Sequence, residues 1–473
     1  MSLKPVSFTW PVDTPLLSLT DADLFTVGNS FEGTAVFGAT GSGKSSGVGA
    51  NLALAMLRSG FSFFVTTTKP TDVSEWQNLA KRAGREADLV IVGPDAPHRL
   101  NVLDYAFRAP GHLAANADNL TGLIMRLVSV RDRNRGQPSE PFWTDSARVA
   151  ATSTIELLTS AGEVISFPNI IKVLGSLPDS PEQARDAAWQ KESFANATID
   201  KAVARKNLTA AQSNDLGVAL EWALSGWPRI YERTRSGIRS TLDSLIFPWT
   251  RSPLATLFGS DTTFTPESCF ERGSIVLLAL DVKTYLESGQ LSQILLKTIW
   301  QQALERRDTA KFPRPVCLWM DEFQNFISDY DPLFQATARS SRAATVCMTQ
   351  NFPSLVARFP GPTGRSEAQA LLGNYVTKVF CSNDDSETNE LASKMIGDAW
   401  TKQSNVTASL GDHGSMSAAT SDSRRRRLEP SAFVQLGKGG GSDRMVEAYV
   451  FRSGKPFKAT GMNHVKVAFS QPS

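Results

Sequence analysis

The sequence predicts an α/β fold with a largely parallel sheet, interrupted by an inserted all-α domain. Short apolar runs bounded by Gly, Pro and Asp occur in both halves of the chain, and each has the length of a buried parallel strand. Between them, residues 106–244 show helical periodicity and no convincing strand. The predicted division is therefore a sheet domain in two parts, 1–105 and 245–473, with the insertion at 106–244.

Composition and charge limit the possible functions. The chain has 473 residues, 41% of them hydrophobic and 20% charged, as in ordinary globular proteins of more than one domain. Its 49 Lys and Arg against 47 Asp and Glu give a net charge of +2. Any attraction to nucleic acid must therefore come from a local surface.

The sequence indicates neither a secreted nor a membrane protein. The four cysteines are widely separated and form no CxxC pair, which argues against a zinc site or a disulfide framework. No apolar run approaches the roughly 20 residues that a membrane-spanning helix needs. The N-terminal MSLKPVSFTWPVDTP lacks the apolar core of a signal peptide. We therefore expect a cytoplasmic protein with no intrinsic membrane span.

The first part of the sheet domain begins with a strand, a glycine-rich loop and a helix. The strand is expected at 34–37, and the helix that starts at Lys44 places Val48, Leu52 and Met56 on one face. Two further parallel strands are expected at 61–65 and 89–92.

The insertion is expected to consist of helices joined by polar loops. One helix starts near Thr144 and another covers 215–224. The polar stretch 131–141 (RDRNRGQPSEP) predicts an exposed loop between them.

The second part of the sheet domain returns to short apolar runs. An amphipathic helix is expected at 291–307, and a mobile loop over the Ser-, Ala-, Gly- and Thr-rich residues 404–423. The expected strands are 274–280, 316–320, 344–348, 376–381 and 446–451.

The strongest functional signal is GATGSGKS at 38–45, a complete Walker A pattern between a predicted strand and a predicted helix. Its glycines let backbone N–H groups surround a phosphate chain at the positive end of the helix dipole. Lys44 is expected to reach the β- and γ-phosphates and the Ser45 hydroxyl to bind Mg²⁺. The alternative is a glycine turn without a ligand. The predicted nucleotide-binding residues are Gly38, Ala39, Thr40, Gly41, Ser42, Gly43, Lys44, Ser45 and Ser46.

A second motif supplies the carboxylates that such a site needs. The apolar run VCLWM at 316–320 ends in Asp321 and Glu322. Asp321 is expected to hold Mg²⁺, and Glu322 to orient and activate the attacking water. Apolar runs that end in acidic residues are also common at solvated strand ends, so the assignment depends on the glycine loop.

Polar residues around the next strand extend the candidate site. Gln350 follows the strand at 344–348, where it can lie near the γ-phosphate as a sensor. Arg339 and Arg342 precede that strand, near the opposite edge of the sheet, where an arginine can serve the nucleotide of a neighbouring subunit. The alternative is a surface arginine and a strand-end amide without a catalytic role.

Taken in order, these motifs resemble the type IV secretion coupling proteins (TraG/TraD type), within the FtsK/HerA class of RecA-like P-loop ATPases. The resemblance covers roughly residues 33–436. It rests on GATGSGKS, FFVTTTKPTD, RLNVLDY, Phe142-Trp143, WMDEFQNF, ARSSRAATVCMTQNFPSL and LLGNYVTKVFCSNDDSETNELASKMIG.

The resemblance implies a RecA-like domain that binds ATP and Mg²⁺ and a ring, hexameric in the family, that moves DNA. The cargo would be DNA or a relaxase–DNA complex delivered to a secretion channel, and the all-α insertion would contact it. Arg339, eleven residues before Gln350, matches the arginine finger of the family, and Gln350 matches its sensor glutamine.

Two features depart from the family pattern. The family usually has an N-terminal transmembrane region and this chain has none, so recruitment to the inner membrane is left to a partner protein. The family's Asp-x-Lys after the second strand is replaced by Thr67 and Lys69, and we expect Lys69 to be a solvated strand-end lysine.

Two groups of arginines are candidate contacts for DNA phosphates. They are Arg131, Arg133 and Arg135 on the expected loop, and Arg424 to Arg427 after the expected mobile segment. The alternative is a solvated charged face, which is the commoner role of such runs.

Other functions stay compatible with the same motifs. A HerA-type motor would serve a nuclease or defence partner, and an adaptor would use ATP binding to switch its recognition of protein substrates. The least specific possibility is a monomeric P-loop NTPase. Hydrolysis stimulated by DNA distinguishes the motors from the adaptor.

Overall fold

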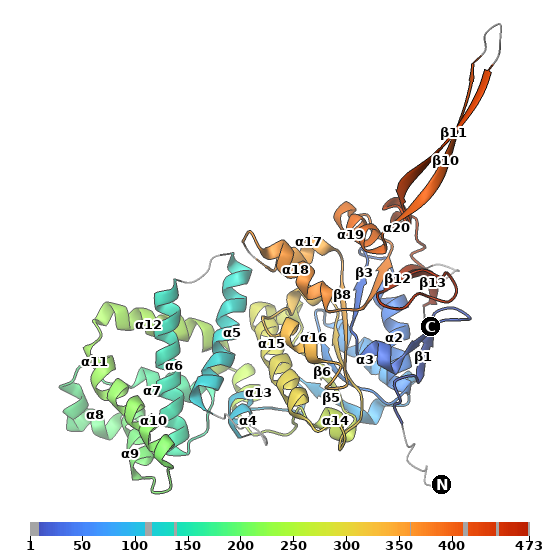
Figure 1. The fold of residues 1–473 in the computed structure, drawn as a ribbon. Coiled ribbons are helices and arrows are strands. Elements are labelled where there is room, and N and C mark those ends of the chain that lie inside the picture. Colours follow the sequence, from blue (N-terminus) through green and yellow to red (C-terminus); the bar gives the residue numbers. More distant parts are fainter. Residues whose placement is uncertain are drawn as a thin grey trace, which may run out of the picture.

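The computed structural model describes residues 9–108, 116–136, 140–359, 361–409, 415–440 and 444–471. Its centre is a nine-stranded sheet with the order β13-β12-β9-β3-β8-β7-β4-β6-β5 (Figure 1). All neighbours from β9 to β5 are parallel, and β12 and β13 are antiparallel additions at one edge, so the predicted α/β fold with a largely parallel sheet is confirmed. The strands are β3 (Thr34–Phe37), β4 (Ser62–Thr66), β5 (Leu89–Val92), β6 (Ile275–Leu278), β7 (Val316–Met320), β8 (Ala343–Thr349), β9 (Thr377–Cys381), β12 (Met445–Arg452) and β13 (His464–Ser470).

Alternate strand residues pack into two apolar cores, one on each face of the sheet. The ring centre of Phe63 lies 5.0 Å from that of Trp76 in α3 (Thr71–Arg82), whereas the ring centre of Phe64 lies 5.1 Å from that of Trp300 in α15 (Val282–Arg306). Helices cover both faces, which explains why the strands are continuously apolar. The helices of this part are α1 (Val27–Ser30), α2 (Ala50–Arg58), α3 (Thr71–Arg82), α15 (Val282–Arg306), α16 (Asp331–Thr337), α17 (Phe352–Val356), α18 (Gly364–Gly373), α19 (Ser386–Ile396) and α20 (Ser431–Val434).

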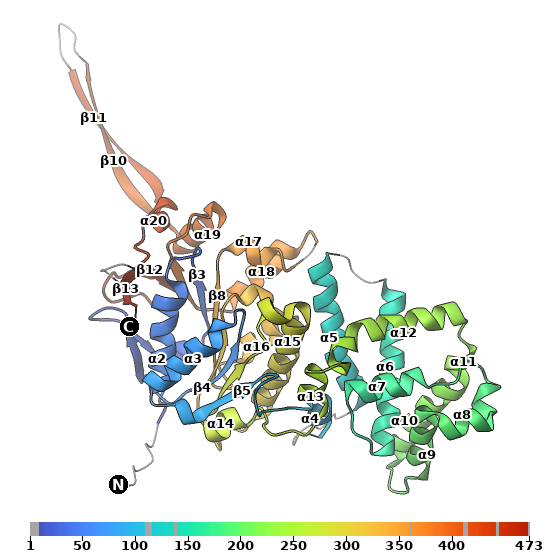
Figure 2. The ribbon, with the colours of Figure 1, turned by 180° about the vertical axis from the view of Figure 1, so that it is seen from behind.

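The described elements between β5 and β6 are helices. Figures 1 and 2 show most of them gathered beside the sheet, with α5 facing α15. The apolar core on the α15 face continues into these helices. Within the described residues, no helix is both long and apolar enough to span a membrane. The helices are α4 (Val102–Arg108), α5 (Ala117–Arg135), α6 (Pro141–Ala161), α7 (Phe167–Gly175), α8 (Ala187–Glu192), α9 (Phe194–Ala204), α10 (Ala210–Glu221), α11 (Trp227–Arg229), α12 (Glu232–Ile246), α13 (Leu254–Gly259) and α14 (Ser268–Arg272).

The chain also forms short 3₁₀ and π-helical turns. The π-helical turns are η1 (Lys44–Gly49) and η4 (Trp222–Gly226), and the 3₁₀ turns are η2 (Glu86–Asp88), η3 (Gln183–Arg185), η5 (Phe247–Thr250) and η6 (Phe323–Asn325).

The prediction of a loop at 131–141 is wrong over the first half of that range. Helix α5 continues through Arg135 and ends at Gly136, whose φ of 64° supplies the left-handed turn that stops it. The side chain of Arg131 is buried, and its guanidinium donates to Ser244 Oγ at 3.1 Å. The polar run predicted a loop because it contains no apolar periodicity. It is helical because the long aliphatic part of an arginine side chain can cover apolar surface. Residues 137–139 lie outside the described residues.

The prediction of a mobile loop at 404–423 is also wrong. Strands β10 (Asp398–Ser409) and β11 (Ser415–Arg426) pair antiparallel from Asp398 with Arg426 to Ser409 with Ser415. The resulting hairpin projects away from the sheet (Figures 1 and 2). Backbone pairing satisfies the peptide groups of such a hairpin whatever its side chains, which is why a Ser-, Ala- and Thr-rich sequence gave no strand signal. Residues 410–414 lie outside the described part.

Three strands and the start of one helix also differ from the prediction. The sequence did not predict the hairpin of β1 (Pro15–Ser18) and β2 (Leu24–Thr26) or the edge strand β13. Helix α15 begins at Val282 rather than 291, because Asp281 caps it by accepting from the Thr284 N–H at 2.9 Å. Leu286 interrupts its first turns with a non-helical φ of 49°.

Candidate active site

The glycine loop lies where β3 passes into η1 and α2. Gly43 has a φ of 81°, and a Cβ there would lie 2.4 Å from Cγ2 of Val446 and 2.9 Å from the carbonyl oxygen of Lys438. Only glycine fits this position, because both the left-handed backbone and the close neighbours exclude a side chain. At the start of the loop, Gly38 donates its N–H to the carbonyl oxygen of Thr349, which joins the loop to the end of β8.

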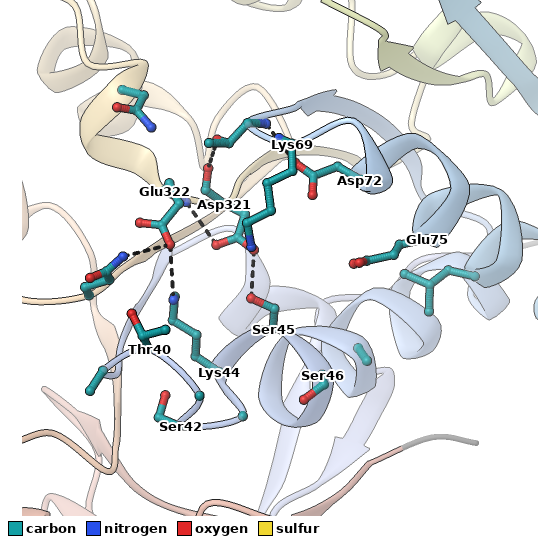
Figure 3. Close-up of a pocket in the computed structure, with 18 of the residues that line it drawn as sticks. Thr40, Ser42, Lys44, Ser45, Ser46, Lys69, Asp72, Glu75, Asp321 and Glu322 are labelled. Atoms are coloured by element: carbon teal, nitrogen blue, oxygen red, sulfur yellow. Dashed lines mark hydrogen bonds and ion pairs between the residues drawn. The ribbon is translucent and has the colours of Figure 1, made fainter. Parts of the chain in front are cut away.

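A cavity of about 1040 Å³ opens above this loop (Figure 3). Because β3, β7 and β8 are parallel, their carboxyl ends meet at one edge of the sheet, and the cavity lies along that edge. The predicted site residues that line it are Ala39, Thr40, Gly41, Ser42, Gly43, Lys44, Ser45, Ser46, Asp321, Glu322 and Gln350.

Two pairs of groups face each other across the cavity. Lys44 Nζ lies 3.2 Å from Glu322 Oε1, and Ser45 Oγ donates to Asp321 Oδ2 at 2.7 Å (Figure 3). Gln350 Nε2 lies 3.4 Å from the same Oε1 of Glu322. The structure therefore brings together the lysine, the hydroxyl, both carboxylates and the amide that the sequence placed at three separate strand ends.

The two adjacent carboxylates have different electrostatic surroundings. Burial raises the pKa of Asp321, although the charge of Lys44 and the hydrogen bond from Ser45 act in the opposite direction. Burial also acts to raise the pKa of Glu322, but Lys44 and the hydrogen bonds from Gln324 and Gln350 outweigh it and lower that pKa overall. With Lys44 at 3.2 Å, the surroundings of Glu322 in this structure therefore favour its ionised form.

Arg339 lies away from this cavity. It precedes β8 while Gln350 follows it, so the two residues are at opposite ends of a seven-residue strand. The Arg339 side chain is 77% exposed, and its nearest carboxylate oxygen, on Glu32, is 3.9 Å away. Arg342 is instead used internally, because its guanidinium donates to the carbonyl oxygens of Pro313 and Trp10 at 2.8 and 2.7 Å.

Several residues of the site were not predicted from the sequence. Thr68 and Asp72 lie on the cavity wall beside Asp321: Thr68 Oγ1 donates to the carbonyl oxygen of Asp321 at 3.3 Å, and Asp72 Oδ2 accepts the Thr68 N–H at 2.7 Å. Lys69 lines the same wall but is exposed. Gln324 donates to Glu322 Oε2 at 2.8 Å, and Asn325 follows it at the cavity rim. The sequence signal for Gln324 was its position two residues after Glu322. No general rule of spacing gives that position a role.

The arginines predicted to contact DNA phosphates make contacts within the chain. Arg133 and Arg135 lie on α5 rather than on a loop; Arg133 stacks over Phe359, and Arg135 pairs with Glu287 at 3.3 Å. In the second group, Arg424 pairs with Asp398 at 2.8 Å. Further internal contacts join Arg426 to Glu390 and Arg427 to the carbonyl oxygen of Asp398.

Comparisons with known proteins give one matching family model and several similar folds. The family model described as Type IV secretory system Conjugative DNA transfer matches residues 12–441. The fold is similar to the bacterial conjugative coupling protein TrwBdeltaN70 in its unbound monoclinic form (17% identity over 94% of this chain and 87% of that chain, TM-score 0.58). It is also similar to TrwB in complex with ADP and Mg²⁺ (16% identity over 95% of this chain and 87% of that chain, TM-score 0.61). VirB4 of Thermoanaerobacter pseudethanolicus matches at 13% identity, with coverages of 93% and 89% and a TM-score of 0.50. No curated protein matches the sequence.

Proposed function

Because this chain belongs to the type IV secretory system conjugative DNA transfer family, its role is to deliver DNA to a type IV secretion system, and we propose that ATP hydrolysis at the glycine loop drives that delivery. One observation carries the proposal: Lys44 and Ser45 oppose Glu322 and Asp321 across a single cavity. Family membership implies DNA and proteins of the secretion system as partners. A relaxase–DNA complex is the proposed form of the cargo.

ATP and Mg²⁺ are the proposed ligands, and the residues present fit both. Every residue of the glycine loop from Ala39 to Ser46 lines the cavity, and the backbone of such a loop can surround phosphates with its N–H groups. The Ser45 hydroxyl and the Asp321 carboxylate supply the hard oxygen donors that Mg²⁺ prefers. Bound Mg²⁺ supplies positive charge to the phosphate oxygens. The structurally similar TrwB has been solved with ADP and Mg²⁺ and with a non-hydrolysable ATP analogue.

Hydrolysis is proposed to use the ionised Glu322 as the base. When Lys44 turns to the phosphates, Oε1 of Glu322 loses its ion pair and becomes free to accept a proton from water. Gln350 donates toward the same oxygen, so its amide is placed to orient that water and to respond to the γ-phosphate.

Arg339 is proposed to act on the nucleotide of a neighbouring copy of the chain. Its position at the amino end of β8 prevents it from reaching the cavity of its own chain, and its exposure leaves the guanidinium available. A head-to-tail contact of this kind forms a ring when its rotation closes, and a ring of six copies is the proposed assembly. This arrangement would complete each site only on assembly.

The helical residues 106–244 are proposed to form the domain that contacts the cargo, inserted between the two parts, 1–105 and 245–473, of the nucleotide-binding domain. A surface that senses cargo must communicate with the site of hydrolysis. The packing of α5 against α15, together with side chains that bridge α5 to Asn325 at the cavity rim, provides that connection.

A chain of hydrogen bonds links the cavity to α5. Gln290 of α15 donates to the carbonyl oxygen of Asn325 at 2.6 Å, and its Oε1 accepts from Asn134 Nδ2 at 2.9 Å. Arg358 donates to Asn134 Oδ1 at 3.0 Å and to Asn325 Oδ1 at 3.3 Å. A displacement of α5 therefore removes the Asn134 contacts of Gln290 and Arg358, the two side chains that hold Asn325, three residues after Glu322.

The Asn134→Ala substitution is expected to weaken this coupling without changing charge. Both contacts of the Asn134 amide are lost, so we expect the ratio of DNA-stimulated to unstimulated ATP hydrolysis to fall about 2- to 10-fold, with the unstimulated rate retained. Gln77→Ala is the control, because Gln77 is an exposed amide on α3, outside residues 106–244 and outside the cavity lining. A ratio equal to that of the unmodified protein would show that this contact does not transmit the effect of DNA.

The proposed function is tested by measuring ATP hydrolysis with and without single- and double-stranded DNA. We expect one form of DNA to stimulate hydrolysis strongly, and Lys44→Ala to abolish it, because the lysine that contacts the phosphates is lost. Hydrolysis that is indifferent to DNA would contradict an autonomous DNA motor and favour an adaptor for protein substrates. Absence of hydrolysis in the assembled protein would contradict the ATPase itself.

A further inference from the structure

The carboxylate of Glu322 is held from two sides. Its Oε1 faces the cavity, where Lys44 and Gln350 contact it. Its Oε2 accepts a hydrogen bond from Gln324 Nε2 at 2.8 Å, the shortest of the contacts to this carboxylate among the described residues. The backbone at Glu322 is left-handed, with φ 53° and ψ 52°, a conformation that costs free energy in a non-glycine residue. The carboxylate is thus presented in one orientation by its neighbours.

The amide of Gln324 is itself oriented by the sheet. A carboxylate oxygen accepts only, so the Gln324 nitrogen must face Glu322 and its Oε1 must face away. Thr349 Oγ1 donates to that Oε1 at 2.9 Å. Thr349 is the buried last residue of β8, paired in register with Phe37 of β3, and its carbonyl oxygen binds the N–H of Gly38. The same residue therefore anchors the glycine loop and sets the direction of the Gln324 amide.

We propose that Gln324 is a positioning residue for Glu322, oriented by the hydroxyl of Thr349, and that the pair keeps Oε1 directed at the attacking water during hydrolysis. The inference rests on the proposed role of Glu322 as the base. Lys44 contacts Oε1 in this structure but is expected on the phosphates during turnover, whereas Gln324 contacts the other oxygen and can stay bound throughout. It is the contact that prevents the freed carboxylate from rotating about its terminal bond.

A purely structural role for the Gln324 side chain is the competing explanation. The turn that carries it is already held without that side chain: Asn325 and Phe326 donate their N–H groups to Glu322 and Phe323 at 2.9 Å. From the other side, Lys297 Nζ donates to the carbonyl oxygen of Phe326 at 2.7 Å. Truncating the Gln324 amide should therefore leave the turn in place and change the carboxylate alone.

The test compares Gln324→Met, Thr349→Val, Thr349→Ser and the double variant Gln324→Met/Thr349→Val in the full-length chain. Loss of one hydrogen bond to a charged group predicts a fall in kcat of about 10- to 100-fold for Gln324→Met, with KM and the Kd of a fluorescent ATP analogue unchanged. Thr349→Val should lower kcat less, and Thr349→Ser, which keeps the hydroxyl, should restore it. The double variant should match Gln324→Met, because Thr349 acts through Gln324.

Each outcome decides the question. Retention of the full kcat by Gln324→Met, or losses that multiply in the double variant, would overturn the positioning role. So would a weakened Kd with unchanged kcat, which indicates a nucleotide contact instead. Gln77→Met, on the exposed surface of α3, controls for the substitution itself. The unmodified protein separates the two hypotheses, because its failure to hydrolyse ATP would contradict the proposed function before any variant is compared.

Discussion

Replacing Glu322 by Gln is expected to eliminate DNA-stimulated ATP hydrolysis while ATP binding persists. The amide keeps the size of the side chain but cannot accept a proton from water. A general base contributes about 100- to 10,000-fold to a rate, so we expect kcat to fall by that factor. The phosphate-binding loop does not include Glu322, and loss of the carboxylate also frees Lys44 from its 3.2 Å ion pair, so binding should be equal or tighter. Steady-state hydrolysis and titration with a fluorescent ATP analogue measure the two effects.

Glu75→Gln is the matched control for this substitution. Glu75 also lines the cavity, and burial raises its pKa, but it lies on α3, away from the pair formed by Lys44 and Glu322. Its replacement should leave hydrolysis close to that of the unmodified protein. Equal losses for the two variants would indicate a general electrostatic effect of the cavity and would contradict the assignment of Glu322 as the base.

Arg339→Ala is expected to reduce hydrolysis in the assembled protein about 1000-fold or more, the lower part of the range for arginine fingers. We expect a second variant that retains Arg339 to complement this defect in a mixed assembly. A mixture of Arg339→Ala and Glu322→Gln chains contains interfaces in which an intact Glu322 meets an intact Arg339 from the neighbouring copy. Mixing two nearly inactive preparations should therefore restore a fraction of the activity, measured as ATP turnover against mixing ratio.

Arg272→Ala is the matched control for the second experiment. Arg272 is likewise an exposed arginine, and it lies at the amino end of β6, on the same edge of the sheet as Arg339. Its loss should leave turnover intact. If mixing restores no activity although the chains assemble together, Arg339 does not act across the interface.

The core of the candidate site could be predicted because phosphate binding is a local property of the chain. A glycine loop between a strand and a helix presents its N–H groups through backbone geometry alone, so GATGSGKS was sufficient to locate it. The apolar strand ending in Asp321 and Glu322 was interpretable once that loop was known. Parallel strands place their carboxyl ends together, so the sequence predicted that Ser45 and Asp321 lie near each other, and the structure places them 2.7 Å apart.

Other features were outside the reach of sequence patterns. The hairpin of β10 and β11 forms through backbone pairing in a sequence without apolar alternation, so the residues predicted no strand. Arg131 lies in a charged run that predicted a loop, yet its stem is buried on α5. The importance of Gln324 depends on Thr349 from another strand, and no local spacing indicates that contact.

Local patterns were enough to predict the parallel sheet, the helical character of residues 106–244, and the phosphate-binding loop with its two carboxylates. Each of these depends on periodicity or on backbone chemistry within a few residues. Three other features became visible only in the folded chain: the orientation of the Glu322 carboxylate, the separation of Arg339 from the cavity of its own chain, and the connection from Asn325 to α5. These depend on contacts between residues far apart in the sequence, which exist only after strand order and helix packing have been set.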